Sequence, residues 1–400
     1  MAPGHDRRNH LTARQFVLAF GVISMLADMV YEGARSVSGP YLATFGASAM
    51  TVGLITGLGE AVALVFRLAS GPLSDRTQRY WTLSIIGYAV TVIAVPFLAV
   101  ASTLAQVGAL IVGERFGKAV RTPARDTMLA AASHASFGRG LAFAVHEAMD
   151  QSGAFVGPLI VAGMIALSGY RAGFAVLAVP GVLTLAVLLW LRRRVPEPTT
   201  YDAAPTPVDQ AGAEAAPVRA LSATFWLYTA FTATAMLGFS TFAVLAYHDQ
   251  VAGIIAPALI PVTYAVAMAA AALSALGSGW LYDRIGLRAL FTALPLAAVV
   301  PILSFSDAVP LVWVGAAVWG AAMGIHESTL RAAVADMIPA ARRGTAYGVF
   351  TAAYGLAWLG GSTVIGALYD ASLVAVTVFV LVTQIVACGL LFVLLRRSPG

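Results

Sequence analysis

The chain has 400 residues, of which 59% are hydrophobic and 11% are charged, and its formal net charge is +5. Because charged residues make up about a quarter of soluble domains, this composition excludes an ordinary soluble protein and predicts an integral membrane protein. The basic excess does not indicate a nucleic-acid surface, since the arginines gather in alternate loops and at both ends of the chain. The single cysteine, Cys388, excludes an intrachain disulfide.

Apolar stretches long enough to cross a bilayer follow one another along the chain, and in lipid such stretches must be helices. We expect spans at about residues 16–45, 50–70, 80–101, 104–120 and 140–167, and a sixth that ends at about residue 194. Residues 196–220, rich in Pro, Ala and Thr, predict a flexible cytoplasmic linker. Further spans follow at about 222–247, 256–278, 289–306, 309–330, 345–369 and 373–395. The sequence therefore predicts an all-α integral membrane protein, with twelve transmembrane helices in two pseudo-symmetric six-helix bundles at residues 1–195 and 221–400.

Two short polar islands lie at equivalent places in the two halves, at residues 71–79 and 279–288. Each is expected to form a turn between two spans, and their similarity indicates an internal duplication. Loops on the side of these islands carry most of the arginines, whereas the opposite loops carry three aspartates and only Arg171. By the positive-inside rule, both termini and both islands are predicted to be cytoplasmic. We therefore expect a multi-pass protein of the cytoplasmic (inner) membrane.

Charged residues lie inside several of the predicted spans of the first half. Asp28, Glu32 and Arg35 share one face of the first span, at spacings of four and three residues. The fourth span contains Glu114, Arg115 and Lys118, and the fifth contains His146, Glu147 and Asp150. Charges at this depth cost several kcal/mol unless they are paired or face water. We therefore interpret these residues as candidates for substrate binding or proton coupling, with a static ion pair to Arg35 or Arg115 as the structural alternative.

The two halves, the long central loop and the pattern Gly-x-Leu-x-Asp-Arg of the first island resemble the major facilitator superfamily of secondary transporters. In that family the aspartate of this motif latches the cytoplasmic ends of the two halves in the outward-open state. The resemblance implies a conformational latch formed by Gly71, Asp75, Arg76 and Arg79, with Arg121, Arg125 and Asp126 as charged neighbours and Gly279, Asp283 and Arg284 as its repeat in the second half.

Residues of the fourth and fifth spans also resemble motifs of this family. Arg115 is similar to the cavity-lining arginine in the fourth span of proton-coupled members, and Gly153, Gly157 and Pro158 resemble the fifth-span motif of antiporters. The resemblance thus implies proton-coupled export of a drug or metabolite. Small residues four apart also let helices pack closely, so a purely structural role for Gly153 and Gly157 stays open.

The expected mechanism is alternating access, in which two similar halves rock around a site near the bilayer midplane. Buried carboxylates there can carry protons, because burial favours the neutral form and a nearby arginine favours the charged form. We expect a small organic substrate, protons and the bilayer as partners, with no cofactor, no enzymatic activity and no nucleic acid, and a monomer as the working unit.

Two alternatives stay open. The first is a symporter or uniporter for a polar or anionic metabolite, with Arg35, Arg115 and Lys118 clamping the anion. The second is a divalent-metal transporter, suggested by the pairs His146 with Asp150 and His326 with Glu327.

Overall fold

The computed structural model describes residues 11–133, 135–136, 139–201, 221–337 and 343–397, and every regular element in these ranges is helical. The first group of helices consists of α1 (Ala13–Arg35), α2 (Ser38–Thr44), α3 (Ala49–Val65), α4 (Arg67–Thr77), α5 (Tyr80–Phe97), η1 (Leu98–Val100), α6 (Leu104–Ser133), α7 (Arg139–Val176), α8 (Ala178–Arg194) and η2 (Pro198–Tyr201). The second group consists of α9 (Ala223–Leu237), α10 (Phe242–Val251), α11 (Ile260–Ile285), η4 (Gly286–Thr292), α12 (Ala293–Ser304), α13 (Val309–Met337), α14 (Arg343–Ala371) and α15 (Leu373–Arg397).

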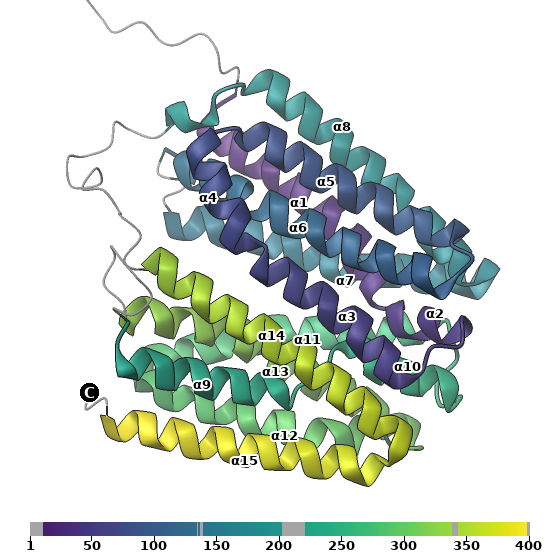
Figure 1. Cartoon of the computed structure of the whole chain (residues 1–400). Coiled ribbons are helices and arrows are strands. Elements are labelled where there is room, and N and C mark those ends of the chain that lie inside the picture. Colours follow the sequence, from purple (N-terminus) through teal and green to yellow (C-terminus); the bar gives the residue numbers. More distant parts are fainter. Residues whose placement is uncertain (1–10, 134, 137–138, 202–220, 338–342, 398–400) are drawn as a thin grey trace, which may run out of the picture.

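The two groups lie one above the other, and their long helices run roughly along one common direction (Figure 1). We call the end where α1 begins and where α8 and α15 finish the terminal end, and the end that carries α2 and α10 the distal end. The groups contact each other through α3 with α14, α7 with α11 and α2 with α10.

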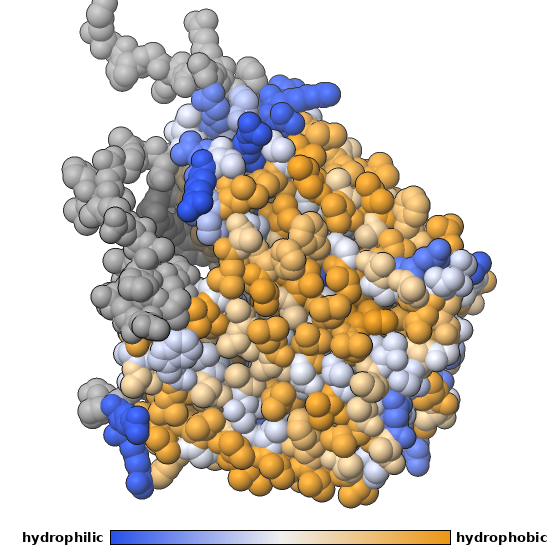
Figure 2. Space-filling model, viewed as in Figure 1, coloured by the Kyte–Doolittle hydropathy of each residue, from blue (hydrophilic) through white to orange (hydrophobic). Residues whose placement is uncertain are grey.

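The outer surface is that of a membrane protein. Figure 2 shows a broad apolar face, with hydrophilic residues gathered toward the two ends. Outward-facing Leu276 and Ile385 are 76% and 68% exposed, as expected where lipid replaces water. Within the described ranges, nine helical stretches are long and apolar enough to cross a membrane. The predicted all-α membrane fold is confirmed. The count of twelve spans stays a prediction, because two of the nine stretches, Leu141–Arg194 and Ile260–Ser304, each join two helices and α6, with its many charges, is not among them.

Two predicted spans that looked continuous are broken. The first changes direction at Ser36 and Val37, between α1 and α2, and the seventh is interrupted at residues 238–241, between α9 and α10. The backbone groups released by these breaks find polar partners, as lipid requires. Trp319 Nε1 donates to the Ser240 carbonyl at 3.1 Å, and the Thr241 backbone N–H donates to Ser362 Oγ at 3.0 Å.

The chain reverses within each polar island, as predicted, although most of each island is helical. Residues 71–77 complete α4, and the chain reverses only at Gln78, whose φ of 50° ends the helix. In the second island α11 continues to Ile285, and Gly286 with φ 60° makes the turn. The residues of each island therefore extend the helix that precedes them by about two turns before the chain reverses. Part of the predicted linker, residues 202–220, lies outside the described residues.

Glycines let α3 and α14 approach each other closely. A Cβ atom added at Gly53 would lie 2.1 Å from the Ser362 carbonyl oxygen, and one at Gly366 would lie 2.3 Å from the Ala49 carbonyl oxygen. Similarly, a Cβ at Gly39 of α2 would lie 1.9 Å from the Ala243 carbonyl oxygen of α10. Such small residues allow backbone contact between membrane helices, and here they join the two groups toward the distal end.

Candidate functional site

Five charged side chains from three helices form a cluster inside the first group of helices, next to the second. We call Glu32, Arg35, Glu60, Glu114 and Arg115 the buried charge cluster; each has a side chain at most 12% exposed. Arg35 lies 3.4 Å from Glu32 and 3.0 Å from Glu60. Arg115 lies 3.3 Å from both Glu60 and Glu114. The cluster holds three carboxylates and two guanidinium groups, and each of them lies beside at least one group of opposite charge, as buried charges must.

A second set of polar side chains continues from this cluster toward the terminal end. Lys118 Nζ donates a hydrogen bond of 2.8 Å to Tyr31 Oη and lies 4.0 Å from the centre of its ring. The Tyr31 hydroxyl in turn donates to Asp28 at 3.3 Å. The charge of Asp150 on α7 also acts on Asp28. Asp28 also lies against α7, because a Cβ atom added at Gly153 would lie 3.0 Å from the Asp28 Cβ.

Further charged side chains on α6 and α7 continue this set toward the terminal end. Arg125 lies 2.9 Å from Asp126 and 3.7 Å from Asp150. His146 lies 3.7 Å from Asp150, and its Nε2 is also 3.3 Å from Ser24 Oγ. The structure thus arranges the predicted groups of α1, α6 and α7 in one nearly continuous row of titratable side chains.

The second group of helices presents aromatic side chains to the cluster. The Tyr264 hydroxyl of α11 donates a hydrogen bond to the Glu32 carboxylate, and the Arg35 guanidinium lies 5.8 Å from the ring centre of Trp358 on α14. Behind Tyr264, the rings of Phe242 and Trp319 continue the aromatic packing, with centres 4.7 Å and 6.5 Å from that of Tyr264. A charged wall and an aromatic wall therefore meet between the two groups.

Most predicted candidates contribute to this row, but not all. The side chain of Glu147 is exposed and accepts a 3.0 Å hydrogen bond from Gln151, so it lies apart from the others. Gly153 and Gly157 face α1: an added Cβ would lie 2.2 Å from the Met25 carbonyl oxygen and 2.4 Å from that of Met29. Their helix contact is therefore direct, and Pro158 lies within α7 next to it.

The predicted latch residues lie at the terminal end. Gly71, Asp75 and Arg76 belong to α4, and Asp75, Arg76 and Arg79 are exposed. Gly279, Asp283 and Arg284 belong to the last turns of α11, and Arg284 lies 3.9 Å from the ring centre of Trp280. Arg121, Arg125 and Asp126, the predicted charged neighbours of Asp75, have other partners among the described residues. Arg125 pairs with Asp126 and Asp150, and Arg121 lies 4.4 Å from the Tyr88 ring centre. The latch role stays a prediction.

Four residues of the site were not among the residues predicted for substrate binding or proton coupling, namely Glu60, Tyr31, Tyr264 and Trp358. Glu60 carried the one available signal, since a carboxylate in the middle of an apolar span is costly. The aromatic residues carried none, because tyrosine and tryptophan are common in membrane helices. Their position depends on how the two groups of helices pack together.

Contacts between the groups also close the distal end. Both carboxylate oxygens of Asp370, at the end of α14, accept hydrogen bonds of 3.1 Å from the first two backbone N–H groups of α3, those of Ala49 and Met50. On another side of the interface the Tyr170 hydroxyl of α7 donates to the Gln250 side chain of α10. These contacts join the two groups far from the terminal end.

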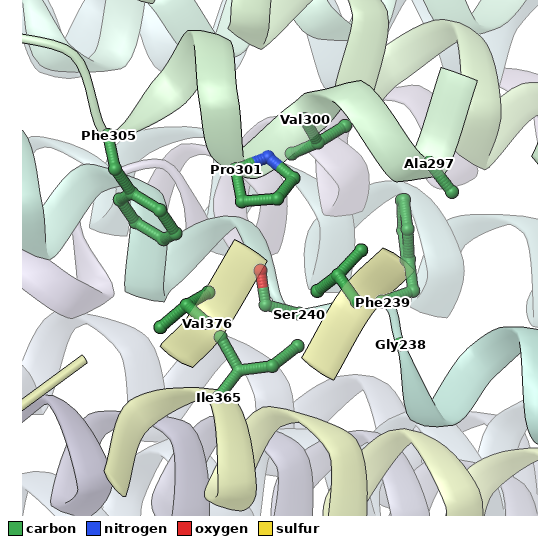
Figure 3. A pocket seen from close by; sticks show the side chains of 10 residues that line it. Gly238, Phe239, Ser240, Ala297, Val300, Pro301, Phe305, Ile365 and Val376 are labelled. Carbon is green, nitrogen blue, oxygen red and sulfur yellow. The ribbon is translucent and has the colours of Figure 1, made fainter. Parts of the chain in front are cut away.

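A small pocket inside the second group is apolar (Figure 3). Phe239, Val300, Phe305 and Ile365 line it together with Ser240, at the break between α9 and α10. It contains no charged side chain, so it does not extend the polar row. In the described part of the chain, no group of three or more His, Cys, Asp and Glu residues is arranged to hold a metal ion.

The helical membrane fold, with buried charges inside the first group of helices and next to the second, defines a multi-pass membrane protein with an internal polar site. The chain belongs to the Major Facilitator Superfamily, because that family's model matches residues 20–362 and, in a second match, residues 264–399. The predicted family is thereby confirmed, and it points to a transporter and not to an enzyme.

Relatives and solved structures agree with this assignment. The chain is 50% identical to an uncharacterized protein of Mycobacterium tuberculosis over 388 residues, covering 96% of this chain and 94% of that one. It is 24% identical to an uncharacterized MFS-type transporter of Methanocaldococcus jannaschii, over 89% of each chain. Among solved structures, a bacterial homolog of the human lysosomal transporter Spinster, inward-facing and unoccupied, superposes with a TM-score of 0.74 at 18% identity, covering 99% of this chain and 100% of that one. A peptide transporter in complex with sulfate superposes with a TM-score of 0.74 at 16% identity, covering 96% and 94%.

Proposed function

We propose that the protein moves a small organic molecule across the cytoplasmic membrane by proton-coupled alternating access, as a monomer whose terminal end faces the cytoplasm. The observation that carries this proposal is the position of Glu32. Its carboxylate pairs with Arg35 at 3.4 Å and accepts the Tyr264 hydroxyl of the other helix group. A proton on Glu32 removes the charge that holds Arg35 and weakens the bond to Tyr264, so protonation and the contact between the two groups are linked.

The contacts of the distal end support one step of this cycle. Asp370 and Gln250 join the two groups there, and in the proposed cycle this arrangement is the one that is closed at the distal end. In the proposed cycle these bonds break when the distal end opens, while contacts at the terminal end form. The predicted latch around Asp75 would hold that second arrangement.

Export in exchange for protons is the direction that the fifth-span resemblance implies. A second candidate, co-transport of a proton with an anionic metabolite, is favoured by a specific contact. Arg35 and Arg115 both bind one oxygen of Glu60, at 3.0 Å and 3.3 Å. Two guanidinium groups around one carboxylate form an arrangement that suits an anionic ligand.

Liposomes test the proposed function. The purified protein is reconstituted with a pH-sensitive dye inside and challenged with organic cations, organic anions, sugars and nucleosides. We expect at least one class to trigger proton movement, and Glu32→Gln to abolish the coupling. The matched control is Asp307→Asn, because Asp307 is exposed in the loop between α12 and α13 and lies outside the row of titratable side chains. Substrate flux that moves no protons would contradict the coupling, and the absence of any flux would contradict transport itself.

A further inference from the structure

Glu60 is the centre of the buried charge cluster, although its span is otherwise apolar. It is 8% exposed, and its Oε1 atom lies within 3.3 Å of guanidinium nitrogens from two different helices, Arg35 Nη2 of α1 and Arg115 Nη2 of α6. One carboxylate oxygen thus holds two cations that would otherwise repel each other. Removing its charge would leave both guanidinium groups without their shared partner, which is costly in a buried place.

The charges that face Glu60 come from α1 and α6. Arg35 and Glu32 lie on α1, and Arg115 and Lys118 lie on α6. Helix α14 contributes Trp358, which lies 5.8 Å from Arg35, and Glu327 of α13 also acts electrostatically on Arg35. Thr241, which precedes α10, contributes an uncharged contact to α3, a 2.8 Å hydrogen bond with the Thr56 hydroxyl.

Hydrogen-bond donors in this region have unused capacity. Within the described residues, Arg115 Nη1 and Trp358 Nε1 are buried without an acceptor, and Arg35 Nη2 is close to Glu60 but not aligned to donate a hydrogen bond to it. Trp358 itself is 2% exposed. Buried donors are normally satisfied. Two guanidinium groups with spare capacity at one carboxylate, with the Trp358 ring 5.8 Å from Arg35, therefore indicate a place for an additional acceptor group.

On the basis of the second candidate function, co-transport of a proton with an anionic metabolite, we propose that Arg35 and Arg115 bind the carboxylate of an organic acid substrate when a proton neutralises Glu60. The protein's own carboxylate marks the charge and the planar shape of the ligand that can replace it, because guanidinium groups bind carboxylates through paired, parallel hydrogen bonds. The aromatic wall of Trp358 and Tyr264 fits an apolar or aromatic body attached to that carboxylate. Substrate anion and proton then bind together, and the pair crosses the membrane without net charge.

This exchange of partners makes affinity depend on pH. Binding of the anion requires uptake of one proton by Glu60, so the Kd of the carboxylate rises about tenfold per pH unit wherever Glu60 is ionised in the free protein. A cationic substrate held by Glu60 would show the opposite dependence, since protonation of Glu60 would weaken its binding.

Binding to the purified full-length protein in detergent tests the proposal. The probes are benzoate, phenylacetate and hexanoate, each matched by an amine with the same body, namely benzylamine, phenethylamine and hexylamine. Isothermal titration at pH 5.5 and 7.5 should show carboxylate binding that is about 100-fold tighter at the lower pH. Glu60→Gln should bind carboxylates with similar affinity at both pH values, and Arg115→Gln should weaken binding about 10- to 100-fold. Asp307→Asn should behave as the wild type.

Several outcomes would overturn the proposal. Carboxylate affinity that does not change between pH 5.5 and 7.5 in the wild type would do so, even if Glu60→Gln does not fold. Retained pH dependence in a folded Glu60→Gln variant, or tighter binding of the amines, would do the same. Proton movement driven by amines in liposomes, without carboxylate binding, would overturn this inference and leave the proposed transport function intact. Tight carboxylate binding without flux of any compound would contradict the transport function instead.

Discussion

Replacing Asp370 by alanine should open the distal end of the molecule. The Asp370 carboxylate accepts two 3.1 Å hydrogen bonds from the backbone of α3, a helix of the other group. These bonds can exist only while α3 and α14 meet at this end. Their loss therefore destabilises the distal-closed arrangement and leaves the opposite arrangement unchanged.

The size of the effect follows from the geometry. A carboxylate that caps a helix N-terminus contributes about 0.5–2 kcal/mol, and its charge adds about 0.3–1 kcal/mol through the helix dipole. Asp370 is exposed, which favours the lower part of both ranges. Ser48 continues to cap Thr51 of α3 at 3.2 Å in the variant. We expect a shift of about 1–2 kcal/mol, equivalent to about a 5- to 30-fold change in the ratio of distal-open to distal-closed molecules.

Distances between spin labels measure this ratio. Thr44 at the end of α2 and Ala252 after α10 are exposed on the two sides of the distal end, and Cys388→Ser removes the native thiol. Asp370→Ala should increase the long-distance population relative to the short one about 5- to 30-fold, and Asp370→Asn should give a smaller increase because it keeps an acceptor. Asp307→Ala removes a charge at the same end without a bond between the groups. A change below about twofold in Asp370→Ala, or an equal change in Asp307→Ala, would refute the reasoning.

Three further predictions concern the interface of the two groups. Gly53→Ala places a methyl group against the Ser362 carbonyl of α14 and should lower the free energy of unfolding by about 1–3 kcal/mol. Its control is Gly113→Ala, where the added atom meets nothing within 4 Å, so that variant should be as stable as the wild type or slightly more stable. Equal melting temperatures of the two variants would contradict this prediction. Tyr264→Phe removes the hydroxyl that binds Glu32 and should alter the pH dependence of transport while keeping substrate affinity within about threefold, and an unchanged pH profile would speak against that link. Asp75→Asn should slow transport cycling while leaving binding largely intact, so a wild-type transport rate would remove its latch role.

The sequence was sufficient for the membrane fold and the family, because hydropathy and the spacing of polar residues depend on each segment alone. It was also sufficient to bring Glu32 and Arg35 onto one face, since residues three and four apart in a helix are neighbours. It could not show that Glu60 binds both Arg35 and Arg115, because that depends on the rotation of three helices about their axes.

The breaks in the first and seventh spans were missed for a related reason. Hydropathy stays high across Phe239, so an average over that span does not reveal the interruption, whereas the residues around Val37 include Arg35, Gly39 and Pro40 and did carry a signal. The polar residues Ser36 and Ser240 were a further signal, and both lie at the breaks. A serine in an apolar span can donate a hydrogen bond to a carbonyl of its own helix, or it can lie at a break. Which of the two occurs depends on partners from distant parts of the chain, such as Trp319.

The most direct test of the account is the coupled motion of the two ends in one population of molecules. Spin labels at Thr44 and Ala252 report on the distal end, and labels at the exposed Ala135 and Ile285 report on the terminal end of the two groups. Both pairs are measured in lipid nanodiscs at pH 5.5 and 7.5, with and without the compound that triggers proton movement in liposomes. Alternating access predicts that the compound, the pH change or both lengthen the distal distance and shorten the terminal one. Distances that stay fixed at both ends, or that lengthen together, would contradict it.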